Sequence, residues 1–376
     1  MKLEGYRVVD LSQFLPGPYL SMLMADQGAE VIKIEAPGGG DPGRHIGAQE
    51  GGRSVFFRNA NRGKRSVCLN LKDVHDREVL ARLLDTADVV IESFRPGVAE
   101  RLGCGADEVR KRNPRIVYCS ISAFGQTGPY RDIPAHDLAV EAIAGTLSVN
   151  VGTDDKPTIP ALPNADMTAS LMALAAILMA LLRREKTGLG DRIDISMHDA
   201  LVACMPNMLG TVFAENRAPI PKVERAWGGA AFYNIYATSD GRHVVLGAQE
   251  MKFVRPLLLE LGRPDLIELC ERGPGAHQQP VIESLRALFV QKTQAHWISW
   301  FAGRDIAFAP VKNLKEAMDD PHLIERGMIL RDARNHRHLG VAIKFHDEPA
   351  RPQLTVPAFG EHTDIVLREN SCPLRG

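Results

Sequence analysis

The 376-residue chain is long enough to form two domains with separate hydrophobic cores. Its formal net charge of −1 gives no sign of a polyelectrolyte partner, and no nucleic-acid-binding motif is present, although basic residues gather at positions 58–65. The cysteines form no Cys-x-x-Cys pair, which predicts no metal site and the reduced, mostly buried thiols of a cytoplasmic protein: Cys68, Cys104, Cys119, Cys204, Cys270 and Cys372.

The N-terminal part alternates predicted strands with predicted helices. The first strand begins within a few residues of Met1, so we expect no signal peptide. Helices are predicted at 19–27 and 76–86. Short runs of aliphatic residues predict buried strands at 7–11, 30–35, 66–71, 88–93 and 115–120. This rhythm predicts a mainly parallel α/β sheet, whose ligands bind beyond the carboxyl ends of the strands.

A glycine-rich segment, Gly38–Gly43, follows the second predicted strand. It matches neither the dinucleotide-binding pattern G-x-G-x-x-G nor the phosphate-binding pattern that ends in Gly-Lys-Ser/Thr. Proline and aspartate within it favour a plain turn, so we predict no dinucleotide or ATP site there.

Helical patterns dominate the region from about 135 to 208. The longest apolar stretch, Ala169–Leu182, is too short to cross a bilayer, so we predict a buried helix and no membrane partner. A strand is predicted at 192–196. The proline-rich linker 216–222 precedes two strands joined at Ser239–Gly241, a strong hairpin signal.

These patterns predict two domains. We expect a large α/β domain at 1–215, completed by the C-terminal segment 330–376. A smaller α+β domain is expected at 223–325, where helices follow the hairpin.

Three titratable residues in different settings suggest an enzyme. Asp166 precedes a long apolar stretch, which can raise its pKa, and His136 could pair with it as an acid and base. Glu250 follows a predicted strand. Structural alternatives remain open: a purely structural role for His136, a helix N-cap for Asp166, and a solvated surface position for Glu250.

Short blocks along nearly the whole chain resemble the family III CoA-transferases (the CaiB/BaiF family) and their relatives, the α-methylacyl-CoA racemases. The blocks follow the family's order: Leu15–Pro18, Gly28–Glu35, Asn61–Ser66, Phe94–Gly103, Phe124–Pro129, Gly188–Asp194 and Gly360–Thr363. The resemblance implies a Rossmann-like large domain and an acyl-CoA substrate. It implies no tightly bound cofactor, because coenzyme A enters as part of the substrate.

The resemblance also implies a CoA-binding site. Ser93, Phe94 and Arg101 stand where the family contacts CoA. Guanidinium groups suit the phosphates of CoA, which makes Arg95 a further candidate beside Arg101. Phe94 offers a face to the adenine, and two leucines could line its slot: Leu69 and Leu71.

Two reactions are open within this family. In the racemases, His136 and Asp166 would exchange the proton on the carbon α to the thioester, with Glu250 paired to His136. In the CoA-transferases, Asp166 would attack the thioester and form an acyl anhydride and then an aspartyl-CoA thioester. The chain departs from the racemases at Ala139-Val140 and Thr168–Ser170. We expect the racemase reaction, with CoA transfer as the alternative.

The resemblance finally implies an interlocked homodimer. In such dimers the active site is shared between the large domain of one chain and the small domain of the other. Glu250 would then reach His136 from the partner chain. A CoA-binding protein without turnover is a third hypothesis, which the presence of all three titratable residues disfavours.

Overall fold

The computed structural model describes residues 1–370 and divides into two compact units. The first unit comprises Met1–Ala144, Ala161–Cys204 and Pro321–Gly376, so the C-terminal segment belongs with the N-terminal one. The second unit comprises Gly145–Pro160 and Met205–Asp320. Cys372 lies outside the described residues.

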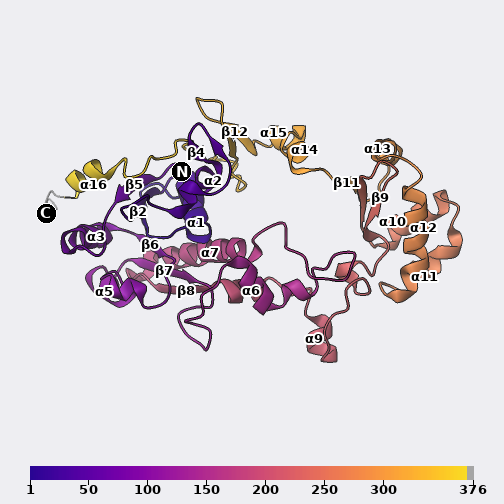
Figure 1. Ribbon diagram of the computed structural model, residues 1–376, viewed down its shortest axis with the longest axis horizontal. Helices are drawn as coiled ribbons and strands as arrows, with labels where there is room; N and C mark the ends of the chain where they lie inside the picture. Colours follow the sequence, from indigo (N-terminus) through magenta and orange to yellow (C-terminus); the bar gives the residue numbers. More distant parts are fainter. Residues whose placement is uncertain (371–376) are drawn as a thin grey trace. The chain divides into compact units, whose positions relative to one another are not determined.

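A six-stranded parallel sheet forms the centre of the first unit (Figure 1). In spatial order its strands are β5 (Arg65–Cys68), β2 (Glu30–Glu35), β1 (Arg7–Asp10), β6 (Val89–Glu92), β7 (Val117–Ser122) and β8 (Arg192–Ser196). Every neighbouring pair is parallel, which confirms the predicted parallel α/β sheet. The strand order reverses between β1 and β6, as in Rossmann-type sheets.

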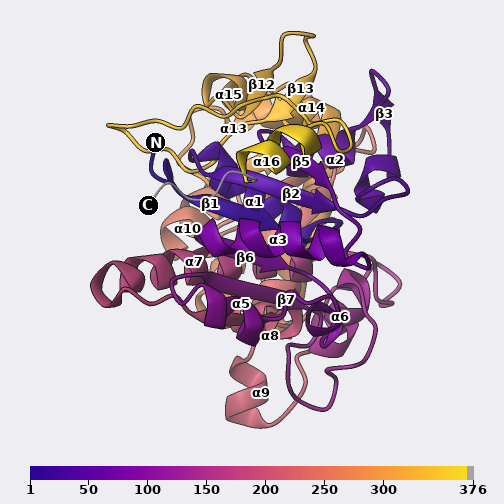
Figure 2. The ribbon, with the colours of Figure 1, turned by 90° about the vertical axis from the view of Figure 1, so that its left-hand side faces the viewer.

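Helices cover both faces of this sheet (Figure 2). One face packs against α3 (Val74–Thr86), α5 (Ala106–Arg112) and α16 (Thr363–Glu369), which bury leucine and valine side chains against β1, β2 and β5. The other face is covered by α1 (Pro16–Asp26) and α7 (Asn164–Thr187). The remaining helices of the unit are α2 (Val55–Asn61), α4 (Val98–Arg101), α6 (Asp137–Ala144), α8 (Met197–Ala203) and α15 (Pro321–Glu325).

The sequence patterns placed most of these elements within a few residues. The strand at 30–35 is confirmed at both ends, and so is the strand at 192–196. Helix α1 begins at Pro16, three residues earlier than predicted, because the fixed φ of proline suits the first turn of a helix. Gly38–Gly43 is a turn, as predicted: Asp41 accepts a hydrogen bond from the backbone N–H of Gly43 at 2.8 Å.

The prediction of a buried helix at Ala169–Leu182 is confirmed for one face only. Helix α7 has 24 residues, long and apolar enough by length and composition alone to cross a membrane, and only 33% of its apolar window is buried. Its inner face packs against β7, β8 and α1. The outer face exposes apolar side chains at helical spacing: Leu171, Leu178, Met179 and Leu182. Helix α7 is apolar on two sides, and the sheet can cover only one of them.

The second unit has an antiparallel sheet covered by helices. Its strands are β9 (Tyr233–Ala237), β10 (His243–Gly247) and β11 (Phe308–Pro310), in the order β11-β10-β9. The turn at Ser239–Gly241 joins β9 to β10 and confirms the predicted hairpin. The helices are α9 (Gly210–Glu215), α10 (Met251–Glu260), α11 (Ile267–Glu271), α12 (Gln279–Phe289), α13 (Gln294–Phe301) and α14 (Leu314–Met318).

A network of buried charges lies below the loop that joins β1 to α1. Lys33 pairs with Asp41 at 2.8 Å, and Lys64 pairs with Asp10 at 3.0 Å, all four side chains being inaccessible to solvent. Burial by itself would raise the pKa of Asp10, but the charges of Lys64 and Lys33 hold it well below its usual range. Lys33 also donates a hydrogen bond to the carbonyl of Ser12 at 2.8 Å. The network therefore fixes the loop from below.

Removing one charge from this network should destabilise the protein strongly. Lys33→Met leaves the Asp41 carboxylate buried without its partner, at a cost of about 3–5 kcal/mol in the free energy of unfolding. The matched control is Lys2→Met, which breaks an exposed pair with Glu348 and should have little effect, because water screens that pair. Urea denaturation monitored by circular dichroism measures the free energy of unfolding of both variants. A loss in Lys33→Met as small as that in Lys2→Met would contradict a stabilising role for the buried network.

Candidate active site

The strand order reverses between β1 and β6, and ligands of such sheets usually bind at the carboxyl ends of the strands at this point. The loop after β1 and the loop after β6 meet there. The backbone N–H of Gln13 donates a hydrogen bond to the hydroxyl of Ser93 at 3.2 Å. Ser93, predicted from the sequence as a CoA contact, thus lies at the position that the sheet topology favours for a ligand.

A buried carboxyl group shapes the turn after β6. Glu92 ends the strand and accepts a hydrogen bond from the backbone N–H of Phe94 at 2.8 Å. Burial raises the pKa of Glu92 to about 7. This short-range contact directs Ser93 and Phe94 away from the strand. The sequence reasoning did not identify Glu92.

The structure groups the other predicted CoA contacts near this turn. Leu71 and Phe94 are half-buried and pack against the same hydrophobic cluster. Leu69 belongs to that cluster itself and is only 2% exposed, so its side chain is not open to a ligand. Arg95 and Arg101 are exposed, and no ion pair engages either side chain within residues 1–370. Both are therefore available to neutralise phosphates.

The loop after β1 also contacts His136. Phe14, within the loop, has a φ of 64°, a left-handed conformation that is uncommon for a residue other than glycine. Its backbone N–H donates to Asp41 at 3.2 Å. Its ring meets the His136 imidazole edge to face, with ring centroids 5.8 Å apart. The buried charge network therefore supports a residue that contacts the predicted acid/base histidine.

Asp137, the neighbour of His136, holds the start of α7. One carboxylate oxygen of Asp137 accepts hydrogen bonds from the backbone N–H groups of Ala165, at 2.8 Å, and Asp166, at 3.1 Å. Glu141, one turn further along α6, accepts from the backbone and side-chain nitrogens of Asn164. These contacts bring the His136-Asp137 turn against the first turn of α7.

The interpretation of Asp166 as an N-cap is wrong. Helix α7 begins at Asn164, Pro163 is its N-cap residue, and no local side chain caps it. Asp166 lies within the first turn, and the free backbone N–H groups of Ala165 and Asp166 at this helix end are bound by Asp137. The carboxylate of Asp166 is consequently not needed to cap the helix, and its structural alternative falls away.

The surroundings of Asp166 suit it to proton transfer. Burial, together with the negative charge of Asp137, raises the pKa of Asp166 to about 7. A carboxyl group at the start of a helix normally has a lowered pKa, because it meets free N–H groups and the positive end of the helix dipole. Asp137 already accepts hydrogen bonds from these N–H groups, and its own negative charge lies at the same end of the helix. Asp137 was not among the residues identified from the sequence, and its adjacency to His136 is the only signal that could have pointed to it.

Glu250 lies in the second unit. It occupies the N-cap position of α10, its side chain makes no capping hydrogen bond, and it is exposed. Its neighbour Gln249 lines a cavity of about 180 Å³ together with Trp227 and Tyr233. Glu250 therefore stands beside a small cavity with aromatic walls, with a carboxylate that is not committed to its own helix.

Comparisons with known proteins identify the family of the chain. Residues 3–363 match CoA-transferase family III. Succinyl-CoA:glutarate CoA-transferase of Mus musculus is 31% identical, covering 98% of this chain and 86% of that protein. Alpha-methylacyl-CoA racemase of Homo sapiens is 32% identical, covering 98% and 93%. The crystal structure of a CAIB/BAIF family protein from Brucella suis superposes with a TM-score of 0.85, at 27% identity, covering 98% of this chain and 99% of that one.

The raised pKa of Asp166 should appear as a pH-dependent cost in stability. The folded state binds this proton up to about pH 7, whereas the unfolded state releases it near pH 4, so ionisation penalises folding as the pH rises between these values. Asp166→Asn should therefore match the parent at pH 4 and exceed its stability by roughly 2–4 kcal/mol at pH 8.

Urea denaturation at several pH values measures this difference. Asp132→Asn is the control, because Asp132 is exposed and belongs to the same part of the chain. Its stability curve should run parallel to that of the parent. Parallel curves for Asp166→Asn as well would show that the carboxyl group has an ordinary pKa.

Proposed function

Because the chain belongs to CoA-transferase family III, we propose that it exchanges the proton on the carbon α to an acyl-CoA thioester and so racemises a 2-methylacyl-CoA type of substrate. His136 and Asp166 act on opposite sides of that carbon. One removes the α-proton and the other returns a proton to the opposite face, which inverts the centre.

The observation that carries this proposal is the environment of Asp166. A carboxyl group whose pKa is about 7 can both accept and donate a proton at neutral pH. A racemase needs this of each group, because the two groups exchange roles between the two directions of the reaction. A carboxylate that acts as a nucleophile must be ionised to attack, so a pKa of about 7 leaves only part of it reactive at neutral pH.

The surroundings of His136 support the same reaction. Its carbonyl accepts the N–H groups of Ala139 and Val140, so His136 stands at the N-terminus of α6. The enolate that forms when the α-proton leaves carries negative charge on the thioester oxygen, which the positive end of α6 would stabilise. We propose that Glu250 pairs with His136, fixing its tautomer and raising its basicity.

CoA transfer is the second candidate, and it has support from a CoA-transferase relative that is 31% identical to this chain, beside the racemase at 32%. Asp166 would then form an acyl anhydride with the acyl group and next an aspartyl-CoA thioester. His136 would orient the thioester carbonyl. Both reactions use the same CoA site, for which we propose Ser93, Phe94, Arg95 and Arg101, with Leu71 beside the adenine and Leu69 behind it.

Deuterium incorporation tests the favoured reaction. The protein incubated with a single enantiomer of a 2-methylacyl-CoA in deuterated water should place deuterium on the α-carbon, as measured by mass spectrometry. His136→Ala and Asp166→Ala should each slow this exchange by about 10²–10⁴-fold, the usual contribution of a general acid or base. Asp132→Asn and His75→Ala, at exposed positions, are the controls and should retain the parent rate.

The same variants separate the two candidate reactions. If His136→Ala keeps CoA transfer to an added carboxylate, and hydroxylamine traps an acyl group on Asp166, the protein is a transferase. No α-deuterium across a series of acyl-CoAs would rule out the racemase reaction. Loss of both activities in Asp166→Ala alone does not distinguish them, so the His136 variant is the informative one.

We further propose that two copies of the chain associate and share their active sites, so that Glu250 acts on His136 of the other copy. The outer face of α7 supports association. Its stripe of Leu171, Leu178, Met179 and Leu182 is 40–68% exposed, although α7 carries Asp166 at its start. An apolar stripe of this length on a water-exposed helix is typical of a protein interface.

A charge on this stripe should weaken the dimer. Met179→Lys places an ammonium group where the partner would bury an apolar side chain, which should raise the dissociation constant at least about tenfold. Leu314→Lys is the control, since Leu314 is an isolated residue, 84% exposed, on α14. Sedimentation velocity over a range of concentrations measures the equilibrium. An active monomeric parent protein would contradict the proposal.

A further inference from the structure

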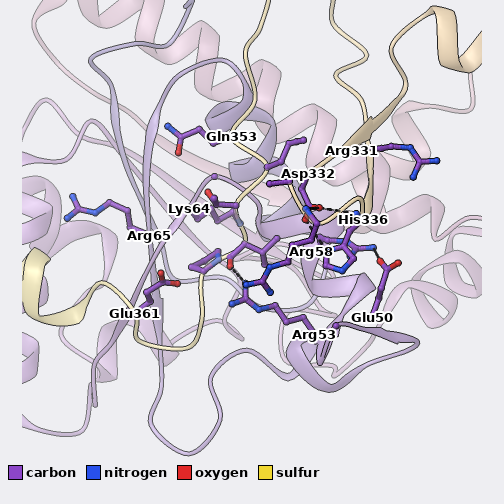
Figure 3. Close-up of a pocket in the computed structure, with 18 of the residues that line it drawn as sticks. Glu50, Arg53, Arg58, Lys64, Arg65, Arg331, Asp332, His336, Gln353 and Glu361 are labelled. Atoms are coloured by element: carbon purple, nitrogen blue, oxygen red, sulfur yellow. Dashed lines mark hydrogen bonds and ion pairs between the residues drawn. The ribbon is translucent and has the colours of Figure 1, made fainter.

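A second cavity, of about 630 Å³, opens in the first unit away from the carboxyl ends of the sheet strands (Figure 3). It is bounded by the hairpin of β3 (Gln49–Glu50) and β4 (Arg53–Ser54), by α2 and the start of β5, and by the hairpin of β12 (Ile329–Arg331) and β13 (Arg337–Leu339). The segment 353–357 closes one wall. The cavity is large enough for a ligand of nucleotide size.

Basic side chains dominate the walls of this cavity, which we call the arginine cavity: Arg53, Arg58, Lys64, Arg65, Arg331 and Arg334. Three of them belong to the basic cluster at 58–65, and the other three come from elsewhere in the chain. The acidic side chains of the wall are Glu50, Asp332 and Glu361. The balance of charge on the wall is therefore positive.

Some of these positive charges are already neutralised inside the protein. Lys64 is paired with Asp10, as described above. Arg65 pairs with Glu30 at 2.7 Å and with Glu369 at 2.9 Å. Arg58 pairs with Glu50 at 2.6 Å, a contact drawn in Figure 3. The positive charges of these three groups are therefore balanced by carboxylates of the protein itself.

Three arginines lack such a partner. Arg53 donates to the carbonyl of Val356, Arg331 donates to Asn335, and no carboxylate lies within ion-pair distance of either side chain or of Arg334 in the described residues 1–370. Of the carboxylates on the wall, that of Glu50 pairs with Arg58, that of Glu361 accepts the backbone N–H of Ala358, and that of Asp332 is occupied by the turn of its own hairpin. It accepts the backbone N–H groups of Arg334 and His336, at 2.9 Å each, and contacts the His336 ring.

Arg58 adds a buried donor to this set. It is 5% exposed, and its Nε has no hydrogen-bond acceptor in the described structure although the atom is shielded from water. A buried N–H group without an acceptor is unfavourable, and most such groups in folded proteins are satisfied. A ligand oxygen that enters the cavity could accept this hydrogen bond.

From these observations we propose that the arginine cavity is a binding site for a phosphate-bearing small molecule, separate from the thioester site. Several guanidinium groups around one cavity match the several oxygens of a phosphate or diphosphate. The cavity touches β5 at its first residue, Arg65, whereas two of the proposed CoA contacts, Leu69 and Leu71, follow its last, Cys68, roughly 10 Å away along the strand.

Titration with inorganic pyrophosphate tests this site. Isothermal titration calorimetry of the full chain at about 0.15 M salt, where long-range charge effects are screened, should show one saturable site per chain with a dissociation constant below about 1 mM. Arg53→Gln and Arg334→Gln should each weaken binding about tenfold, because each removes a charged hydrogen bond. Both residues are exposed, so these variants should fold.

Two control variants locate the site. Arg272→Gln changes an exposed arginine of the second unit and should bind pyrophosphate like the parent. Arg101→Gln should also bind like the parent, because Arg101 belongs to the proposed CoA site and not to this cavity. Pyrophosphate should likewise raise the melting temperature of the parent and of Arg101→Gln, but not of the double variant Arg53→Gln/Arg334→Gln.

Three results would overturn the proposal: no saturable binding, equal binding by the parent and the double variant, or loss of binding in Arg101→Gln alone. The last would place pyrophosphate in the CoA site, as a substitute for the phosphates of CoA. Free CoA provides the converse arm. It should compete with an acyl-CoA substrate and leave pyrophosphate binding unchanged.

Discussion

The buried charges of Asp10, Lys33, Asp41 and Lys64 are the constraint on which the rest of the first unit depends. Buried charges persist only where they are paired, and here the pairing also sets the path of the loop between β1 and α1. Lys33 holds the Ser12 carbonyl, and Asp41 holds the N–H of Phe14 in its left-handed conformation. The network therefore fixes the conformation of a loop at the carboxyl-terminal edge of the sheet.

That loop links the two halves of the proposed site. On one side it contacts Ser93, and on the other its Phe14 ring lies against His136. The next residue, Asp137, binds the start of α7, and together with burial, the larger cause, its charge raises the pKa of Asp166. The groups proposed to bind the thioester and those proposed to move its proton thus share one support. Two neighbouring carboxyl groups, Asp166 and Asp137, lower the stability of the folded protein. This loss is consistent with a site selected for chemistry and not for stability.

Much of the fold could be predicted from local patterns, because the signals for it are local. Strands such as Glu30–Glu35 are short aliphatic runs, and the hairpin at Ser239–Gly241 has its own turn residues. Helix α7 was misjudged because its sequence is apolar on two sides, and a pattern does not show which side the sheet will cover. The role of Asp137 was missed because its contacts with Ala165 and Asp166 span 28 and 29 positions of sequence.

The sequence by itself determined the strand and helix alternation, the candidate reactive groups and the family resemblance, since each depends on residue type and order. Only the tertiary structure decided how those groups are tuned. Hydrogen bonds and burial arise between segments far apart in the chain, so the freeing of Asp166 from a capping role could not be read from its neighbours. The arginine cavity is similar, because its unpaired charges come from β4 and from the β12–β13 hairpin, some 280 residues apart, and meet only when the chain folds.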